Sequence, residues 1–158
     1  GEEITLTLLC NSENSFKSNV CSQLVTAFSQ IGIQLNINSL PFDQYQQPLN
    51  SGNFDLYYGD VILTPGFDVR ALLMSGGSLN YGRITDATLD SKIMSVRTAS
   101  ADTLEQAETD FYEYFLSKMP ILPLAFERNQ VIVRSGLLTG FSPRPYNIFW
   151  TPNEWRLG

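Results

Sequence analysis

The first forty residues carry a strand–helix–strand pattern, which limits the possible folds more than any other feature of the sequence. Ile4–Cys10 is rich in apolar residues, and Ile33–Leu40 alternates apolar with polar side chains, so both segments are predicted to be strands. Between them a helical pattern runs from Phe16 to Ile31, and Gly32 follows it as a typical helix end. Two strands joined by a helix of this length form a right-handed parallel crossover. The sequence therefore predicts an α/β fold with a mixed, mainly parallel sheet flanked by helices.

Helical spacing of apolar residues continues along the chain. In the first helix the residues expected on the buried face are Val20, Leu24, Phe28 and Ile31. Later helices are expected to start near Pro41, Asp68, Asp86 and Asp102. In the last of these, Glu105 has capping-box spacing and Pro120 is expected to end the helix. Two further strands are predicted over Ile121–Phe126 and Gln130–Arg134, and residues 135–158 predict irregular structure because they are rich in glycine, proline and aromatic side chains.

The charge and residue content of the chain exclude several classes of function. The net charge is −6, whereas a nucleic-acid surface needs clustered lysine and arginine, so we expect no nucleic-acid partner. The chain has no histidine, no glycine-rich phosphate loop and no cluster of metal ligands, so we expect no enzymatic activity, no cofactor and no metal site. No apolar run is long enough to span a bilayer. Cys10 and Cys21 are predicted to be small buried residues that can be neighbours, and not a disulfide framework.

The segment Phe54–Leu73 points to a binding edge. It begins as an aromatic and β-branched run, which favours a strand over Phe54–Tyr58, and it is then interrupted by Gly59-Asp60. In open α/β sheets, ligands bind outside the carboxyl ends of the strands. A strand that ends in a carboxylate is therefore expected to deliver a polar group to a crevice. Because Tyr57 and Tyr58 alternate on the strand, one can face a ligand while the other belongs to the core.

Three groups of segments, read in order over nearly the whole chain, resemble a known family. Together they are similar to the C-terminal half of the bacterial extracellular solute-binding proteins for oligopeptides, dipeptides and nickel, the capture subunits of ABC importers. The segments that carry the resemblance are Gly32–Leu40 with Ser51–Leu56, Gly76–Gly82 with Leu89-Asp90, and Met119–Leu124 with Gly140–Pro143.

The resemblance implies a two-lobe fold that closes around a ligand, of the periplasmic-binding-protein type II. Residues 1–128 would then form the second lobe, and residues 129–158 would be a tail that crosses back to the first lobe. The implied partners are a peptide ligand, a membrane permease and the first lobe, and the implied location is outside the cytoplasm, with a lipoprotein tether. If the first lobe is missing, the tail is expected either to fold back on its own lobe or to pair with a second copy in a homo-oligomer. Its aromatic side chains would otherwise be exposed; they are Phe141, Tyr146, Phe149, Trp150 and Trp155.

The resemblance also assigns site residues. The segment that includes Tyr57, Tyr58, Gly59 and Asp60 matches the cleft wall of the peptide-binding members, where a carboxylate pairs with the free amino terminus of the peptide. By this match Asp60 is the amine anchor. Asn80 and Tyr81 match a loop on the same wall. The sequence departs from better-known members after Asp60, so Asp68 is the alternative anchor.

Each assignment has a structural alternative. Asp60 can instead be a turn residue that caps a backbone amide, and Asp68 is favoured as the N-cap of a short helix. Asn80 can bind ligand backbone or only tolerate a left-handed turn. Trp150 and Trp155 are interpreted as packing residues or as an exposed contact to the other lobe, and not as ligand platforms. The alternative function is a ligand-sensing domain of a bacterial transcription regulator, since related two-lobe modules are fused to DNA-binding domains.

Overall fold

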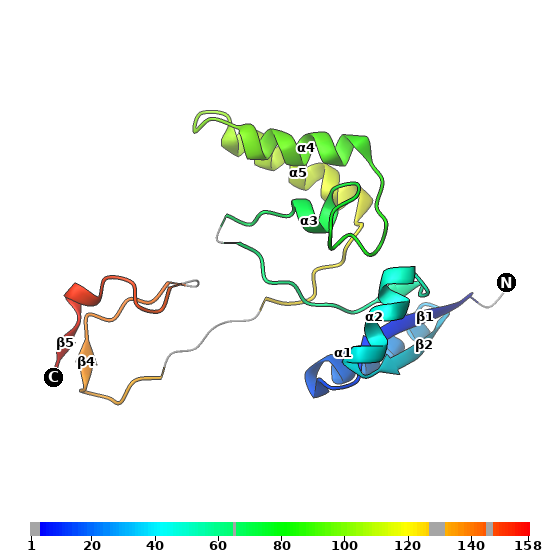
Figure 1. Cartoon of the computed structure of the whole chain (residues 1–158), viewed down its shortest axis with the longest axis horizontal. Helices are drawn as coiled ribbons and strands as arrows, with labels where there is room; N and C mark the ends of the chain where they lie inside the picture. The colour runs from blue at the N-terminus through cyan, green and yellow to red at the C-terminus, as the bar shows by residue number, and fades with distance from the viewer. Residues whose placement is uncertain (1–3, 65, 127–131, 145–146) are drawn as a thin grey trace. The chain divides into compact units, whose positions relative to one another are not determined.

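Three parallel strands form the main sheet (Figure 1). The computed structural model describes residues 4–64, 66–126, 132–144 and 147–158. Within it, β1 (Ile4–Asn11) lies between β2 (Ile33–Leu40) and β3 (Leu56–Tyr57) and is parallel to both. Helix α1 (Ser15–Gln30) connects β1 to β2. The predicted α/β fold with a parallel sheet is therefore confirmed, although the third strand is shorter than the predicted Phe54–Tyr58.

One face of the sheet packs against α1. Leu8 and Cys10 of β1 form a buried cluster there with Leu35 and Cys21. The side chains of α1 that complete this cluster are Leu24, Val25 and Phe28. The predicted buried face is thus correct for Leu24 and Phe28. It is wrong for Ile31, which is 70% exposed because it follows the last turn of α1 as its C-cap.

The two cysteines are free, fully buried neighbours in this cluster. Cys10 donates a hydrogen bond from its thiol to the carbonyl oxygen of Asn11, with an Sγ–O distance of 3.5 Å. Burial, reinforced by the hydrogen bond and charge of Cys10, raises the pKa of the Cys21 thiol to about 12. Cys21 is therefore protonated at neutral pH and unreactive as a nucleophile. This agrees with the predicted role of small buried residues.

The opposite face of the sheet is covered by α2 (Phe42–Ser51). Leu9 is fully buried there against Tyr45 and Leu49 of α2. The helix ends at Gly52, which takes a left-handed conformation with a φ of 74°. Glycine adopts this conformation without the steric cost that a Cβ atom brings. The sheet is therefore a middle layer, with α1 on one side and α2 on the other.

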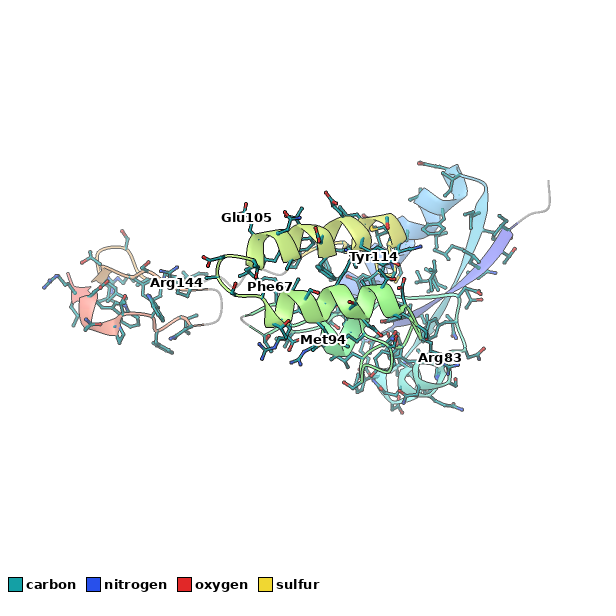
Figure 2. All side chains as sticks on the ribbon, turned by 90° about the horizontal axis from the view of Figure 1, so that it is seen from above. Phe67, Arg83, Met94, Glu105, Tyr114 and Arg144 are labelled. Carbon is teal, nitrogen blue, oxygen red and sulfur yellow. The ribbon has the colours of Figure 1, made fainter. Side chains whose placement is uncertain are left out.

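Beyond the sheet, α3 (Arg70–Leu73) is followed by α4 (Ala87–Thr98) and α5 (Leu104–Lys118), which pack side by side (Figures 1 and 2). Asp86 caps α4 as predicted, because its carboxylate accepts hydrogen bonds from two backbone amides of the first turn. The same carboxylate accepts a hydrogen bond from the hydroxyl of Tyr114 on α5, with an O–O distance of 2.8 Å. One side chain therefore starts α4 and ties it to α5.

Helix α5 begins later than predicted. Its N-cap is Thr103 and not Asp102. The backbone amide of Ser100 donates to the hydroxyl oxygen of Thr103 at 3.0 Å, so a local turn sets the helix start. Glu105 consequently lies at the second helical position, and the predicted capping box does not form. The predicted end of the helix before Pro120 is confirmed.

The chain divides into two compact units, residues 1–120 and 121–158. In the second unit, β4 (Leu138–Thr139) pairs antiparallel with β5 (Arg156–Leu157), which follows the 3-10 helix η1 (Pro152–Glu154). The strand predicted over Ile121–Phe126 is wrong, since this segment is irregular. An extended segment becomes a strand only where another strand pairs with it, and none does so in the described residues. Of the predicted strand Gln130–Arg134, residues 130–131 lie outside the described residues and residues 132–134 are irregular.

The aromatic side chains of the second unit pack on one another. The ring of Trp155 lies 5.1 Å from that of Phe141 and 5.9 Å from that of Phe149, measured between centroids. Trp150 is 43% exposed, and the guanidinium of Arg144 lies over its ring. Trp155 is thus a packing residue, one of the two roles expected from the sequence, whereas Trp150 remains partly exposed. Tyr146, expected to be an exposed tail aromatic, lies outside the described residues.

Candidate ligand-binding site

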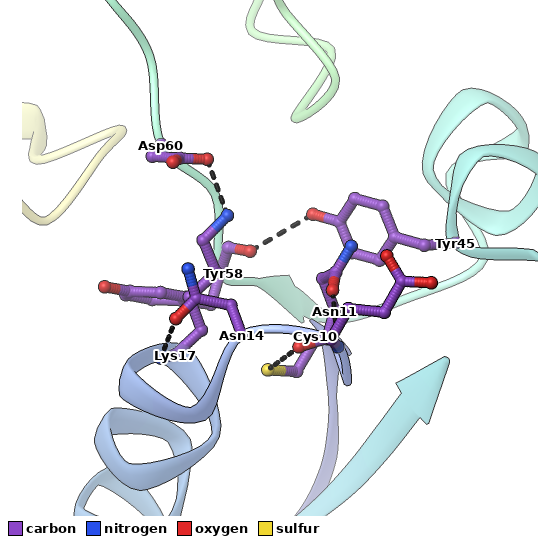
Figure 3. A network of polar contacts seen from close by, with 8 residues as sticks. Cys10, Asn11, Asn14, Lys17, Tyr45, Tyr58 and Asp60 are labelled. Carbon is purple, nitrogen blue, oxygen red and sulfur yellow. Dashed lines mark hydrogen bonds and ion pairs between the residues drawn. The ribbon is translucent and has the colours of Figure 1, made fainter. Parts of the chain in front are cut away.

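The carboxyl ends of β1 and β3 lie side by side and continue into polar residues (Figure 3). After β1 the chain reaches Asn14, which caps α1 by accepting a hydrogen bond from the backbone amide of Lys17 at 3.1 Å. After β3 the backbone amide of Tyr58 donates to the carbonyl oxygen of Leu9 at 2.9 Å, which holds the exit of β3 beside β1. The parallel pairing therefore brings Asp60 to the same edge of the sheet as the first turn of α1.

At this edge the carboxylate of Asp60 binds an ammonium group from its own chain. The Nζ atom of Lys17 donates to the Oδ1 atom of Asp60 at 2.7 Å (Figure 3). The Asp60 side chain is 79% exposed, whereas that of Lys17 is only 16% exposed. In the part of the chain that the structure describes, Asp60 accepts no other hydrogen bond, so it caps no backbone amide there. Its carboxylate is thus paired with one ammonium group and otherwise faces solvent.

Tyr57 and Tyr58 point to opposite faces of the sheet, as their alternation predicted. Tyr57 packs in the cluster of Leu9 and Tyr45, and Tyr58 packs in the cluster on the α1 face. Both are partly buried, and burial raises the pKa of each phenol above its ordinary value, so both are neutral at physiological pH. The hydroxyl of Tyr45 donates to the carbonyl oxygen of Tyr58 at 3.1 Å (Figure 3). This hydrogen bond between Tyr45 and Tyr58 holds the segment that leads into Gly59 and Asp60.

Asn80 holds the loop between α3 and α4 together. Its side-chain amide donates to the carbonyl oxygens of Met74 and Ile84 and accepts from the backbone amide of Ile84, all within 3.0 Å. The carboxamide is therefore engaged within the loop. Tyr81 packs edge-on against Tyr57, with 6.1 Å between ring centroids. Of the sequence-predicted pair, Tyr81 lies next to the strand segment that carries Asp60.

Asp68 is paired inside the chain. Its carboxylate accepts from the backbone amide of Arg70 at 3.1 Å and is held by the guanidinium of Arg70 at 2.6 Å. The prediction of Asp68 as the N-cap of this helix is wrong by one residue, because the N-cap of α3 is Val69. The carboxylate of Asp68 nevertheless bonds to the backbone amide of Arg70 in the first turn. The hydrogen bonds from Arg70 lower the pKa of Asp68 to about 2. Asp68 also lines an open groove of about 520 Å³ formed by residues of 61–79.

The Asp68–Arg70 pair predicts how acid affects stability. The folded-state pKa of about 2 lies below the ordinary value of 3.8, so the pair stabilises the fold above pH 3.8 and loses this contribution as the pH falls towards 2. We expect Asp68→Asn to lower the free energy of unfolding at pH 6 and to have little effect near pH 2, as measured by urea denaturation. Asp102→Asn, on an exposed carboxylate, is the control. A loss of the same size at both pH values for Asp68→Asn would contradict the prediction.

The segment after Asp60 exposes apolar side chains. Ile62 is 99% exposed, Phe67 is 62% exposed and Val61 is 40% exposed. Single exposed apolar residues are common on soluble proteins, but contiguous apolar patches mark interaction surfaces. A carboxylate followed by exposed apolar residues suits a ligand with a charged end and an apolar body.

Sequence reasoning missed Lys17 as a site residue. Its position gives one signal: a cation in the first turn of a helix is disfavoured by the helix dipole, and the first turn of α1 contains no acidic residue to offset it. Its partner Asp60 is 43 residues away along the chain. The pairing therefore follows from the parallel alignment of β1 and β3, which local patterns do not reveal.

In the described parts of the chain, no three histidine, cysteine, aspartate or glutamate side chains gather closely enough to hold a metal ion. None of the helices in these residues has both the length and the apolar character needed to cross a membrane. Comparisons of the sequence with protein-family models and with curated protein sequences each gave no match.

Solved structures of binding proteins share the fold of this chain. NikZ from Campylobacter jejuni, solved with Ni(L-His), has a TM-score of 0.69 and 16% identity over 96% of this chain and 33% of its own. The murein tripeptide binding protein MppA from Escherichia coli has a TM-score of 0.72 and 19% identity over 87% of this chain and 28% of its own. The oligopeptide-binding protein AppA from Bacillus subtilis, solved with a nonapeptide, has a TM-score of 0.66 and 16% identity over 100% of this chain and 32% of its own.

These matches test the resemblance read from the sequence. The chain spans about a third of the length of each of these proteins. The shared part covers most or all of the chain, including the sheet and the loops at its carboxyl edge. The chain therefore has the fold of the solute-binding proteins for peptides and nickel, as its sequence predicted.

Proposed function

We propose that this chain is the second lobe of an extracytoplasmic solute-binding protein that captures peptides for an ABC importer. The observation that carries the proposal is the exposed carboxylate of Asp60 at the carboxyl edge of a parallel sheet, in a fold that aligns over its whole length with the peptide-bound AppA. Ligands of open α/β sheets bind at this edge. The remaining partners are then the first lobe of the same protein and a membrane permease, and a lipoprotein tether would hold the protein at the cell surface.

Two of the neighbouring structures are described with peptide ligands, whose chemistry suits this edge. AppA is described with a nonapeptide, MppA as binding a murein tripeptide, and NikZ with a nickel–histidine complex. A free peptide carries an ammonium group at its amino terminus at neutral pH. Asp60 already binds an ammonium, that of Lys17, at 2.7 Å. We therefore assign Asp60 as the anchor of the ligand's amino terminus. We give Asp68 a structural role because its carboxylate also accepts a hydrogen bond from the backbone amide of Arg70 at the start of α3 and its side chain is only 30% exposed.

Replacing Asp60 by asparagine tests this anchor. In the complete two-lobed protein we expect Asp60→Asn to weaken the binding of a free peptide by about 1.5–3 kcal/mol, the range for a hydrogen bond to a charged group. Asparagine has nearly the same shape as aspartate, so the loss of binding free energy measures the contribution of the negative charge at position 60. Isothermal titration calorimetry of the wild type and the variant measures it.

Two controls sharpen this test. A peptide with an acetylated amino terminus has no ammonium group, so it should bind weakly to the wild type and be almost indifferent to Asp60→Asn. The matched variant Asp68→Asn should leave peptide affinity unchanged. The anchor role is excluded if free and acetylated peptides bind the wild type equally well. If Asp68→Asn carries the whole loss, the anchor is Asp68.

A further inference from the structure

The ammonium of Lys17 occupies the same carboxylate that would anchor the ligand. The ion pair is short, with 2.7 Å between Nζ and Oδ1, and it joins the first turn of α1 to the segment after β3 (Figure 3). In the described residues, Lys17 Nζ has no other acceptor and Asp60 has no other donor. The pair is therefore a closed unit of one positive and one negative charge.

The start of α1 does not depend on the Lys17–Asp60 pair for its cap. A cation in the first turn opposes the helix dipole, and Asn14 already caps α1 through its side chain. The burial is also uneven, since Lys17 is 16% exposed and Asp60 is 79% exposed. A residue that breaks a local rule without a local gain is expected at a functional position.

One carboxylate cannot neutralise two ammonium groups. A ligand amine that reaches Asp60 meets the Lys17 ammonium at contact distance from the same carboxylate, and like charges this close repel each other. We infer that Lys17 is a tethered competitor: it holds Asp60 while the site is empty, it is displaced by the ligand's amine, and it then binds an anionic group of the ligand. This inference rests on the proposed function and adds a selectivity to it.

The exchange selects among peptides by the charge next to their amino terminus. When a peptide with a neutral first residue binds, the Lys17–Asp60 ion pair is broken and Lys17 gains no new anionic partner. An acidic first residue places a carboxylate close to the amine, so the displaced Lys17 gains a new partner and the lost pair is offset. A basic first residue adds a repulsion. The ligand class favoured is therefore a peptide with a free amine and an acidic first side chain.

The test compares three tripeptides, Glu-Ala-Ala, Gln-Ala-Ala and Lys-Ala-Ala, by calorimetry on the complete protein and its Lys17→Gln variant. An ion pair at a protein surface is worth about 0.2–1 kcal/mol, which corresponds to a change of about 1.4- to fivefold in affinity. We expect Lys17→Gln to raise the affinity for Gln-Ala-Ala by that factor and that for Lys-Ala-Ala by at least as much. The affinity for Glu-Ala-Ala should stay unchanged. Lys17→Gln removes the Lys17–Asp60 pair of the empty site and also the pair that Lys17 would form with the peptide's glutamate, so the two effects offset each other.

Two further variants identify the cause. Lys92→Gln, on a lysine that lies over the ring of Tyr114, makes the same change in net charge and should not separate the three peptides. In the double variant Lys17→Gln with Asp60→Asn, the gain for Gln-Ala-Ala should vanish. The competitor role is wrong if Lys17→Gln weakens all three peptides or shifts all three alike, since Lys17 would then orient Asp60 or act by net charge. If the wild type binds none of the three peptides or other free peptides, the proposed function itself fails.

Discussion

The variant Leu9→Ala is expected to lower the free energy of unfolding by about 2–5 kcal/mol, the range for deleting a buried leucine side chain. Leu9 is fully buried on the α2 face of β1, in contact with Tyr45 and Leu49. These neighbours belong to a helix held on a three-stranded sheet, so they cannot close the cavity without moving α2. Urea denaturation of the 158-residue chain at pH 7 measures the loss.

Leu9 also lies next to the strand segment that leads to Asp60. The carbonyl oxygen of Leu9 accepts the backbone hydrogen bond of Tyr58, two residues before Asp60. The matched control is Ile62→Ala, because Ile62 is 99% exposed and should change stability by less than about 0.5 kcal/mol. Equal losses for the two variants would show that the packing around β1 is not the core of the fold.

The second large effect is the loss of ligand binding when the chain is studied alone. Binding pockets bury about 70–90% of the surface of a small ligand. Under the proposed function this chain supplies one wall of the cleft, so most of that burial is missing. We expect the 158-residue chain to fold but to bind free tripeptides with a Kd weaker than about 1 mM.

Calorimetry of the isolated chain and of the complete protein, with the same peptide, tests this expectation. Hydrogen exchange of the β1 amides serves as the folding control, because protected amides show that the sheet is formed. Tight binding by the isolated chain would mean that the site is complete within these residues. The role of a single cleft wall would then be wrong.

The main fold could be predicted from the sequence because its signals are local. The apolar patterns of Ile4–Cys10 and Ile33–Leu40 and the helix between them appear in the structure within one residue at each end. Asp86 was predictable as a cap because it needs only the amides of the next turn. At α5 the same capping rule places the helix start one residue too early. The rule selects Asp102, but Thr103 takes the N-cap position because its hydroxyl group closes a turn with Ser100.

The candidate site was only partly predictable. The sequence pointed to Asp60 at a strand end, and the alternation of Tyr57 and Tyr58 placed them on opposite faces, as the structure confirms. It did not reveal that the side-chain amide of Asn80 donates hydrogen bonds to the carbonyl oxygens of Met74 and Ile84. The hydrogen-bond partners of a side chain in a loop depend on how the loop closes, which residue types do not specify.

The sequence by itself determined the order and type of the elements in the first unit, because strand and helix periodicities are properties of neighbouring residues. Only the tertiary structure decided which charges meet. Lys17 and Asp60 are 43 residues apart, and they form a 2.7 Å ion pair because β1 and β3 are parallel neighbours whose carboxyl ends share one edge. Strand order is set by the packing of α1 and α2 on the two faces of the whole sheet, so no local pattern encodes that contact.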